Sequence, residues 1–207
     1  MPNERVTVYI DGYNLYYGLK AAGLRTSRWL DLVELSRSLL LPRQELSLVR
    51  YFTTRVRNDP GASQRQARYI DALEARGGIS LDYGHFLSKS VTCNSCGNTW
   101  PKNEEKKTDV NIAVRLLEDA FDDAFDVAIV MSGDSDLAPP IESVRRRLSH
   151  KRVIVAFPPQ RYSAELERVA TGSLRLTPAV IRSNLLPATV HTRTGFALQA
   201  PAGWMPR

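Results

Sequence analysis

The sequence Val127-Ala-Ile-Val-Met-Ser-Gly-Asp-Ser-Asp136 decides the fold that we expect for this chain. Its first five residues form an apolar run that is typical of a strand buried on both faces. The run breaks at Ser132-Gly133, and Asp134 and Asp136 follow before a helix-like segment begins at Leu137. A buried strand that ends in this way places carboxylates at the carboxyl edge of a sheet, where open α/β folds bind ligands.

A second stretch repeats this design near the N-terminus. The apolar run Val6-Thr-Val-Tyr-Ile10 is followed by Asp11-Gly-Tyr-Asn14 and then by a short helical pattern. A third acid, Asp109, stands at the start of a long amphipathic helix expected over 108–121. Because three segment ends carry acids, we expect a single acidic site to which all three contribute.

Strands alternate with helices along most of the chain, which favours a mainly parallel sheet covered on both faces. We therefore predict a three-layer α/β/α sandwich of Rossmann-like architecture, with a mainly parallel central sheet. The expected strands lie at 6–10, 46–53, 79–83, 127–131, 153–157 and 174–176. The first strand is not followed by Gly-x-Gly-x-x-Gly, and no Gly-x-x-x-x-Gly-Lys-Ser/Thr occurs, which disfavours dinucleotide and P-loop sites.

The predicted domain covers residues 1–182 and contains a small Cys-bearing hairpin insertion at about 85–104. From residue 183 to 207 the periodic pattern fades, and Pro187, Gly195, Pro201 and Gly203 interrupt it. We expect this C-terminal tail to be loosely ordered.

Composition limits the classes of protein that fit. The 207 residues include 43% hydrophobic and 24% charged residues, as in ordinary globular proteins. No apolar run reaches the roughly 20 residues that cross a bilayer, and the N-terminus lacks a signal-peptide pattern. We therefore expect a cytoplasmic protein without a membrane partner. The net charge of +6 suits a polyanionic partner such as a nucleic acid.

The candidate site residues are the acids Asp11, Asp109, Asp134 and Asp136. Carboxylates in one cleft repel each other and must hold either protons or a cation. Oxygen ligands without histidine or thiolate suit Mg²⁺ or Mn²⁺, which polarise a phosphate and activate a water for attack. Each acid also has a structural explanation: Asp11 as a turn residue, Asp136 as a helix N-cap and Asp109 as a first-turn acid. This explanation is weakest for Asp134, because Asp136 already supplies the cap. Asn14 either caps its helix or orients Asp11. The acids Asp119, Asp122, Asp123 and Asp126 cluster around a helix end, where we expect them to be solvated.

Several segments resemble the NYN-domain family, the LabA-like relatives of PIN-domain nucleases. They are Tyr9-Ile-Asp11-Gly-Tyr-Asn14-Leu, Glu105-Lys106-Lys-Thr-Asp109-Val-Asn-Ile-Ala, Ser132-Gly-Asp134-Ser-Asp136-Leu and Val153-Ile-Val-Ala-Phe-Pro158. The resemblance covers about residues 5 to 176. It implies a PIN-like sandwich and a metal-dependent endoribonuclease, with Asp11, Asn14, Asp109 and the Asp134–Asp136 pair as its site residues.

Basic and aromatic residues near the expected carboxyl strand ends are candidates for RNA binding. These are Arg55 and Arg57 after the second strand, Lys106 and Lys107 beside Asp109, Arg161 after the fifth strand, and Tyr13.

Cys93-Asn-Ser-Cys96-Gly97 has the spacing of one zinc knuckle. Structural zinc needs four ligands, so His85 or the cysteines of a second subunit in a homodimer would have to complete it. A reduced thiol pair in a surface hairpin and a redox role are the other interpretations.

Two rival functions remain open at this stage. The first is a non-catalytic RNA-binding or regulatory protein with the same fold. The second is a phosphotransferase of haloacid-dehalogenase type with Asp11 as nucleophile. Position 13 disfavours the second rival, because that chemistry typically has an aspartate where this chain has a tyrosine.

Overall fold

The computed structural model describes residues 3–56, 59–92, 95–106 and 108–206, and of residues 85–91 and 100–106 it describes the backbone alone. Its elements are β1 (Glu4–Asp11), α1 (Gly12–Ala21), η1 (Arg25–Ser27), α2 (Leu32–Arg37), β2 (Gln44–Thr53), α3 (Pro60–Arg76), β3 (Ile79–Tyr83), β4 (His85–Thr92), β5 (Thr99–Lys106), α4 (Thr108–Phe121), β6 (Val127–Met131), η2 (Ser135–Leu137), α5 (Ala138–Arg147), β7 (Arg152–Phe157), α6 (Ala164–Val169), β8 (Gly172–Arg175), α7 (Pro178–Ser183), β9 (Thr189–His191) and β10 (Ala197–Gln199).

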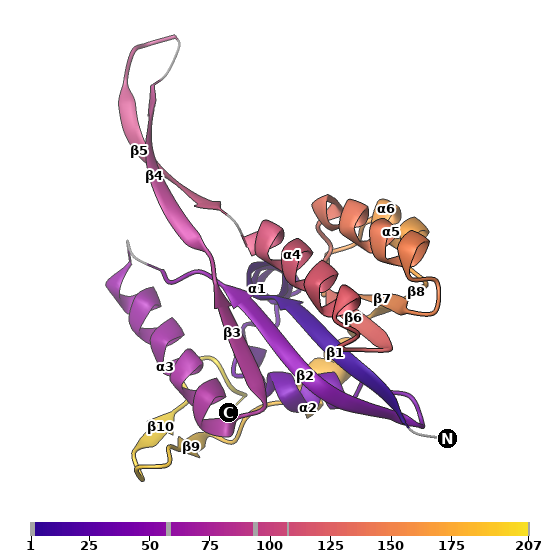
Figure 1. Ribbon diagram of the computed structural model, residues 1–207. Helices are drawn as coiled ribbons and strands as arrows, with labels where there is room; N and C mark the ends of the chain where they lie inside the picture. The colour runs from indigo at the N-terminus through magenta and orange to yellow at the C-terminus, as the bar shows by residue number, and fades with distance from the viewer. Residues whose placement is uncertain (1–2, 57–58, 93–94, 107, 207) are drawn as a thin grey trace.

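Six parallel strands form the central sheet in the order β3-β2-β1-β6-β7-β8 (Figure 1). The predicted α/β class and parallel sheet are confirmed. β1 and β6 are the central pair, and Val8 of β1 lies opposite Ile129 of β6. Both strands are almost completely buried, which explains why they are nearly continuous apolar runs in the sequence.

Helices cover both faces of the sheet, and alternate residues of β1 point into two separate cores. Val8 packs in a core with Leu15 of α1 and Leu73 of α3. Tyr9 packs in the opposite core with Leu116 of α4 and Ile141 of α5. The chain leaves β1 toward β2 on one side and leaves β6 toward β7 on the other. The carboxyl ends of β1 and β6 therefore form a topological switch point, the place where open α/β sheets bind ligands.

Strands β4 and β5 form an antiparallel hairpin that projects from the body of the molecule (Figure 1). It begins directly after β3 and ends directly before α4, close to the predicted insertion at 85–104.

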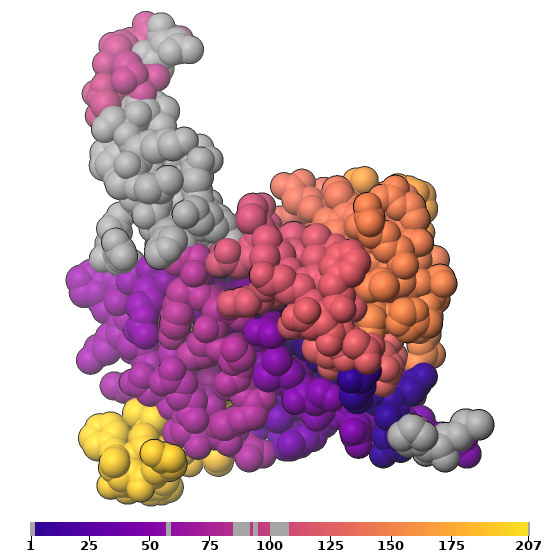
Figure 2. Space-filling view, viewed as in Figure 1, coloured from indigo at the N-terminus to yellow at the C-terminus, as the bar shows by residue number. Residues whose placement is uncertain are grey.

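The C-terminal segment differs from the loosely ordered tail that we expected from residue 183. It forms the hairpin of β9 and β10, contacts α3, and lies against that part of the molecule in Figure 2. Leu198 and Trp204 are buried in the same core as α1 to α3. The backbone amides of Arg28 and Trp29 donate hydrogen bonds of 3.2 and 3.3 Å to the Trp204 carbonyl. The prolines and glycines of this segment form turns between its short elements, and the segment still packs against the domain.

Candidate active site

Asp11 is the last residue of β1 and the N-cap of α1, and its side chain is buried. Its Oδ1 accepts a hydrogen bond of 2.9 Å from the backbone amide of Asn14, and its Oδ2 accepts one of 2.9 Å from the Ser132 hydroxyl. Gly12 permits this close join between strand and helix, because a Cβ there would lie 2.7 Å from the Phe52 carbonyl oxygen. The carboxylate is therefore fixed by the turns that follow β1 and β6.

The turn after β6 is bound to α1 on one side and to the segment after β7 on the other. The Gly133 amide donates a 3.0 Å hydrogen bond to Oδ1 of Asn14, and the Asp134 amide donates one of 3.1 Å to the Ser132 hydroxyl. A Cβ on Gly133 would lie only 3.0 Å from atoms of Arg161, so glycine allows that segment to approach. The Asn14 side chain has neither of the roles suggested by the sequence: Asp11 is the N-cap of α1, and only the backbone amide of Asn14 bonds Asp11, while its Oδ1 binds the turn after β6.

A pocket of about 330 Å³ lies at this switch point, and we call it the acidic pocket. Its lining includes Asp11, Asn14, Thr108, Asp109, Asp134 and Arg161. These residues come from the end of β1, the start of α1, the start of α4, the turn after β6 and the loop after β7. Three of the four predicted acids therefore line one pocket, although they are far apart in the sequence.

Arg161 gives the acidic pocket a positive group. Its Nε atom is buried and has no hydrogen-bond partner among the described residues. A buried guanidinium N–H without an acceptor is costly, and an anionic ligand oxygen would remove that cost. Arg161 was predicted from the sequence to contact RNA, and its position in the pocket is compatible with a phosphate contact.

Burial raises the pKa of the Asp11 carboxyl above its ordinary value, and the nearby charge of Asp134 raises it further. The hydrogen bonds from the Asn14 amide and the Ser132 hydroxyl act in the opposite direction, because they favour the ionised form. The net direction is upward, so Asp11 in this pocket favours either a proton or a neighbouring cation.

Asp136 is not brought into the pocket; its side chain is exposed. The sequence suggested that Asp136 caps the following helix and leaves Asp134 free for chemistry. In the structure Asp134 is the N-cap of η2, and its Oδ1 accepts a 3.1 Å hydrogen bond from the Asp136 amide. The cap lies two residues earlier because a short 3₁₀ turn precedes α5.

The donors in the acidic pocket fit a hard cation. Asp11, Asp109 and Asp134 present carboxylate oxygens, which Mg²⁺ and Mn²⁺ prefer. Within the described ranges, no three histidine, cysteine or acidic side chains are grouped closely enough to form a complete protein cage. Mg²⁺ typically binds one or two carboxylates and keeps several waters, so such a cage is not required for it.

The other predicted binding residues are spread more widely. Tyr13 lines the acidic pocket and donates a 3.1 Å hydrogen bond to the Thr54 carbonyl. Arg55 is exposed and stacks on the Tyr83 ring at 4.9 Å, outside the pocket. His85 and Lys106 are paired in the β4–β5 hairpin, and their side chains lie outside the described atoms, as do Arg57, Cys93 and Lys107 as whole residues. Cys96 is an exposed free thiol, so zinc binding stays a prediction.

Sequence reasoning missed two residues of the pocket. Thr108 is buried, and its hydroxyl lies 3.3 Å from the Thr54 hydroxyl, which links the start of α4 to the end of β2. Tyr17 lines the pocket from α1, one turn after Tyr13, and the two rings stack at 6.2 Å. The sequence around these two residues contains no motif that marks them, because their place in the pocket depends on residues that are distant in the sequence.

Comparison with known proteins gives three results. Residues 5–177 match the model of the NYN domain. A 6-hydroxy-3-succinoylpyridine 3-monooxygenase of Pseudomonas putida is 28% identical to this chain over 177 residues. The match covers 68% of this chain and 55% of that protein, so the chain spans about half the length of that relative. A crystal structure of a protein of unknown function from Vibrio parahaemolyticus matches with a TM-score of 0.59 at 22% identity. The match covers 89% of this chain and 97% of the Vibrio chain, and it supports the fold alone.

The part of the chain that the structure describes contains no helix of the length and hydrophobicity that a membrane span requires. The match to the family model covers most of the chain and includes every segment that lines the acidic pocket. The chain belongs to the NYN-domain family.

Proposed function

We propose that this protein is a metal-dependent endoribonuclease that hydrolyses RNA phosphodiester bonds in the acidic pocket. One observation carries the proposal: Asp11, Asp109 and Asp134 line a single pocket at the topological switch point together with Arg161, whose buried Nε has no partner among the described residues. The NYN domain is a PIN-like nuclease family, which supports the same reaction class.

The residues of the pocket have distinct roles in this proposal. Of Asp11, Asp109 and Asp134, one or two would bind Mg²⁺ or Mn²⁺ directly and the others would contact it through its waters. The ion when bound would supply Lewis acidity at the phosphate and lower the pKa of a nearby water. Arg161 binds a phosphate oxygen through its guanidinium, whose Nε has no hydrogen-bond partner in the described part of the chain. Ser132 and Asn14 position the acids, because they join the turn after β6 to Asp11 and to α1. Asp136 has no place in this scheme.

The alternative is an RNA-binding or regulatory protein that does not cleave. The observation that favours it is the lack of any closely grouped set of three metal-ligating side chains among the described residues. Both functions require a cationic contact to phosphate, so only turnover separates them.

The name of the Pseudomonas relative adds a third ligand class, a pyridine that carries an acid side chain. Because this chain covers only 55% of that protein, we use the class as a competitor in binding experiments and not as the proposed substrate.

The deciding experiment incubates the purified chain with a mixed pool of single-stranded and structured RNA. Mn²⁺, Mg²⁺ and a chelator are compared for the wild type, Asp134→Asn and Asp122→Asn. Asp122 is an exposed acid outside the pocket, so its variant makes the same chemical change without touching the site. We expect cleavage only with metal, and a loss of about a hundredfold or more in Asp134→Asn alone.

Equal cleavage by wild type and Asp134→Asn would contradict the proposal, because it would indicate a different centre or a contaminant. Salt-sensitive RNA binding without cleavage in either metal would favour the non-catalytic alternative. Asp136→Asn completes the set, and it should lose far less activity than Asp134→Asn because its side chain lies outside the acidic pocket.

A further inference from the structure

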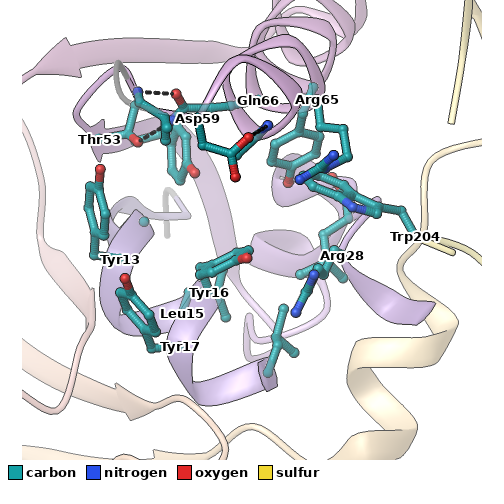
Figure 3. Close-up of a pocket in the computed structure, with 17 residues that line it drawn as sticks. Tyr13, Leu15, Tyr16, Tyr17, Arg28, Thr53, Asp59, Arg65, Gln66 and Trp204 are labelled. Carbon is teal, nitrogen blue, oxygen red and sulfur yellow. Dashed lines mark hydrogen bonds between the residues drawn. The ribbon is translucent and has the colours of Figure 1, made fainter. Parts of the chain in front are cut away.

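The structure has a second cavity, of about 280 Å³. Figure 3 shows its lining residues. The cavity lies between α1 and α3 above the end of β2, and its walls include Tyr13, Tyr16, Tyr17, Tyr51, Tyr69 and Trp204. We call it the aromatic pocket. Tyr13 and Tyr17 line both cavities, so the two pockets share a wall.

The rings of the aromatic pocket are held in place by their surroundings. Tyr69 donates a 2.9 Å hydrogen bond to the Leu30 carbonyl, and its ring packs edge-on against Trp204 and Tyr51, with centroids 5.8 and 6.5 Å apart. Tyr16 and Tyr17 pack edge-to-face at 5.3 Å on α1. A cavity with rigid aromatic walls suits a flat, π-rich ligand, because ring faces offer stacking area at little cost in conformational entropy.

Two arginines line the same cavity, Arg28 and Arg65. The Arg28 guanidinium lies over the Tyr16 ring at 4.7 Å, and its Nε is buried without a hydrogen-bond partner among the described residues. A ligand acceptor beside Tyr16 would satisfy this atom. The occupant should therefore combine a flat ring with hydrogen-bond acceptors or negative charge.

The other polar side chains of the pocket are already used by the fold. Gln66 donates to the Thr54 carbonyl at 2.9 Å and accepts from the Val56 amide at 2.8 Å. Asp59 caps α3 and accepts from the Ala62 amide at 2.9 Å. Figure 3 shows Asp59, Gln66 and Arg65 on the side opposite Tyr13, Tyr16 and Tyr17. Recognition is thus left to ring faces and to guanidinium groups.

We propose that the aromatic pocket takes one unpaired nucleobase of an RNA strand whose neighbouring phosphate lies in the acidic pocket. This inference rests on the proposed function, since it adds the base next to the cleaved bond. A volume of about 280 Å³ is at the lower end of small-molecule pockets, so it suits a single ring system rather than a dinucleotide. The shared wall of Tyr13 and Tyr17 lets one nucleotide span both pockets.

The proposal defines the substrate more closely than the acidic pocket alone does. A base inside a duplex cannot reach the aromatic pocket without leaving its stack, so cleavage should require an unpaired nucleotide. Stacking and guanidinium contacts tolerate every base, so we expect weak sequence preference together with a strong preference for single strands.

The test measures binding in chelator, where no cleavage occurs, by fluorescence anisotropy of a labelled single-stranded RNA of about ten nucleotides. A matched set of RNAs lacks one base at each position in turn. We expect the wild type to lose affinity about five- to a hundredfold when one particular base is removed. Tyr16→Ala should bind the intact RNA more weakly by a similar factor and lose little more when that base is absent, as expected for two groups in contact.

Three further variants control for folding and charge. Tyr16→Phe keeps the ring and should bind like the wild type, which separates stacking from loss of structure. Tyr162→Ala removes an exposed tyrosine outside both pockets and should leave the pattern of base removal unchanged. Arg28→Gln should weaken binding, whereas Arg25→Gln, an exposed neighbour outside the pocket, should weaken it less at the same ionic strength.

Two results would overturn the proposal. One is wild-type affinity that does not depend on any single base. The other is saturable quenching of tryptophan fluorescence by nicotinate, lost in Tyr16→Ala, from a protein that does not bind the RNA; the pocket would then serve a small aromatic acid.

Cleavage of the same RNAs in Mn²⁺ separates this inference from the nuclease. Binding that depends on one base without cleavage would keep the nucleobase pocket and remove the nuclease. Cleavage that does not depend on any single base would keep the nuclease and remove the nucleobase pocket.

Discussion

The hydroxyl of Ser132 donates a hydrogen bond of 2.9 Å to Oδ2 of Asp11, across 121 positions of sequence. The same hydroxyl accepts from the Asp134 amide at 3.1 Å, and Ser132 is completely buried. One side chain therefore fixes Asp11 at the end of β1 relative to the turn that carries Asp134. The geometry of the acidic pocket depends on this link between the two central strands.

Ser132→Ala should lower metal affinity and metal-dependent cleavage by about ten- to a hundredfold, as is typical when a partner of a metal-binding carboxylate is removed. It leaves a buried oxygen of Asp11 without its donor and should also destabilise the fold by about 1–3 kcal/mol. Mn²⁺ titrations of cleavage rate and a urea unfolding curve measure the two effects. Ser135→Ala, an exposed hydroxyl three residues later, is the control. Wild-type cleavage at every Mn²⁺ concentration would show that Ser132 has no role in positioning.

Asp11→Asn should stabilise the protein in chelator while removing cleavage. Burial raises the pKa of Asp11, so ionisation costs stability above that pKa, and the cost is relieved as pH falls through it. Asparagine caps helices as well as aspartate does and carries no charge. We expect a higher melting temperature for the variant at neutral pH, by about 2–4 °C for each kcal/mol, and a smaller difference at lower pH.

Added Mn²⁺ should reverse the order of the two melting temperatures, so that the wild type melts above Asp11→Asn. A cation that binds the folded wild type raises its melting temperature by mass action, and the uncharged variant should gain less. A variant that melts below the wild type in chelator would show that the carboxylate of Asp11 stabilises the fold through its hydrogen bonds more than its burial costs.

The sheet and three acids of the pocket were predictable because their signals are local. β1 and β6 are apolar runs that end in a glycine turn with an acid, and that pattern depends only on nearby residues. The switch point then follows from strand order, which fixes where Asp11 and Asp134 meet. Asp136 illustrates the limit of local rules, because a single 3₁₀ turn moves the cap to Asp134.

Features that depend on distant partners were not predictable. Trp204 is buried against Tyr69, more than a hundred residues away, so its segment appears in the sequence only as an irregular tail. The aromatic pocket draws its rings from α1, β2, α3 and that segment, and no one stretch of sequence contains its pattern.

The free energy of unfolding should fall at alkaline pH, because buried tyrosines can ionise in the unfolded chain. Burial raises the pKa of Tyr51 to about 12 and that of Tyr69 well above its ordinary value. The folded state keeps these phenols protonated while the unfolded chain ionises near pH 10, so stability falls as pH rises from about 10 toward 12. Tyr51 alone should account for roughly 2–3 kcal/mol by pH 12.

Urea unfolding at pH 8 and pH 11 measures this effect. Tyr51→Phe keeps the ring and removes the ionisable group, so its stability should depend less steeply on pH over this interval. An identical pH dependence in Tyr51→Phe and wild type would show that the Tyr51 phenol does not contribute. Tyr17→Phe, which removes the hydroxyl of an exposed tyrosine, is the matched control.

We expected Asp119 to be solvated, and this prediction is wrong, because its side chain is buried. Its carboxylate accepts hydrogen bonds from the Tyr9 hydroxyl at 2.7 Å and from Nε and Nη2 of Arg50 at 2.8 and 2.9 Å. The side chains of Arg50 and Asp119 are only 16% and 11% exposed, so the pair is largely shielded from water. Asp119→Ala would leave the Tyr9 hydroxyl without its acceptor and would leave Arg50 with the more distant Asp82 carboxylate, at 3.8 Å, as its ion-pair partner. We therefore expect a loss of up to about 3–5 kcal/mol in unfolding free energy.

Asp122→Ala, an exposed acid on the next turn, should change stability by less than about 0.5 kcal/mol. A double variant, Arg50→Met with Asp119→Leu, removes both charges and should recover much of the loss, because a buried ion pair is often no more stable than well-packed apolar groups. If Asp119→Ala is no worse than Asp122→Ala, the network contributes nothing to stability. If the double variant is as unstable as Asp119→Ala, the loss comes from the Tyr9 hydroxyl that has lost its acceptor and not from the charge of Arg50.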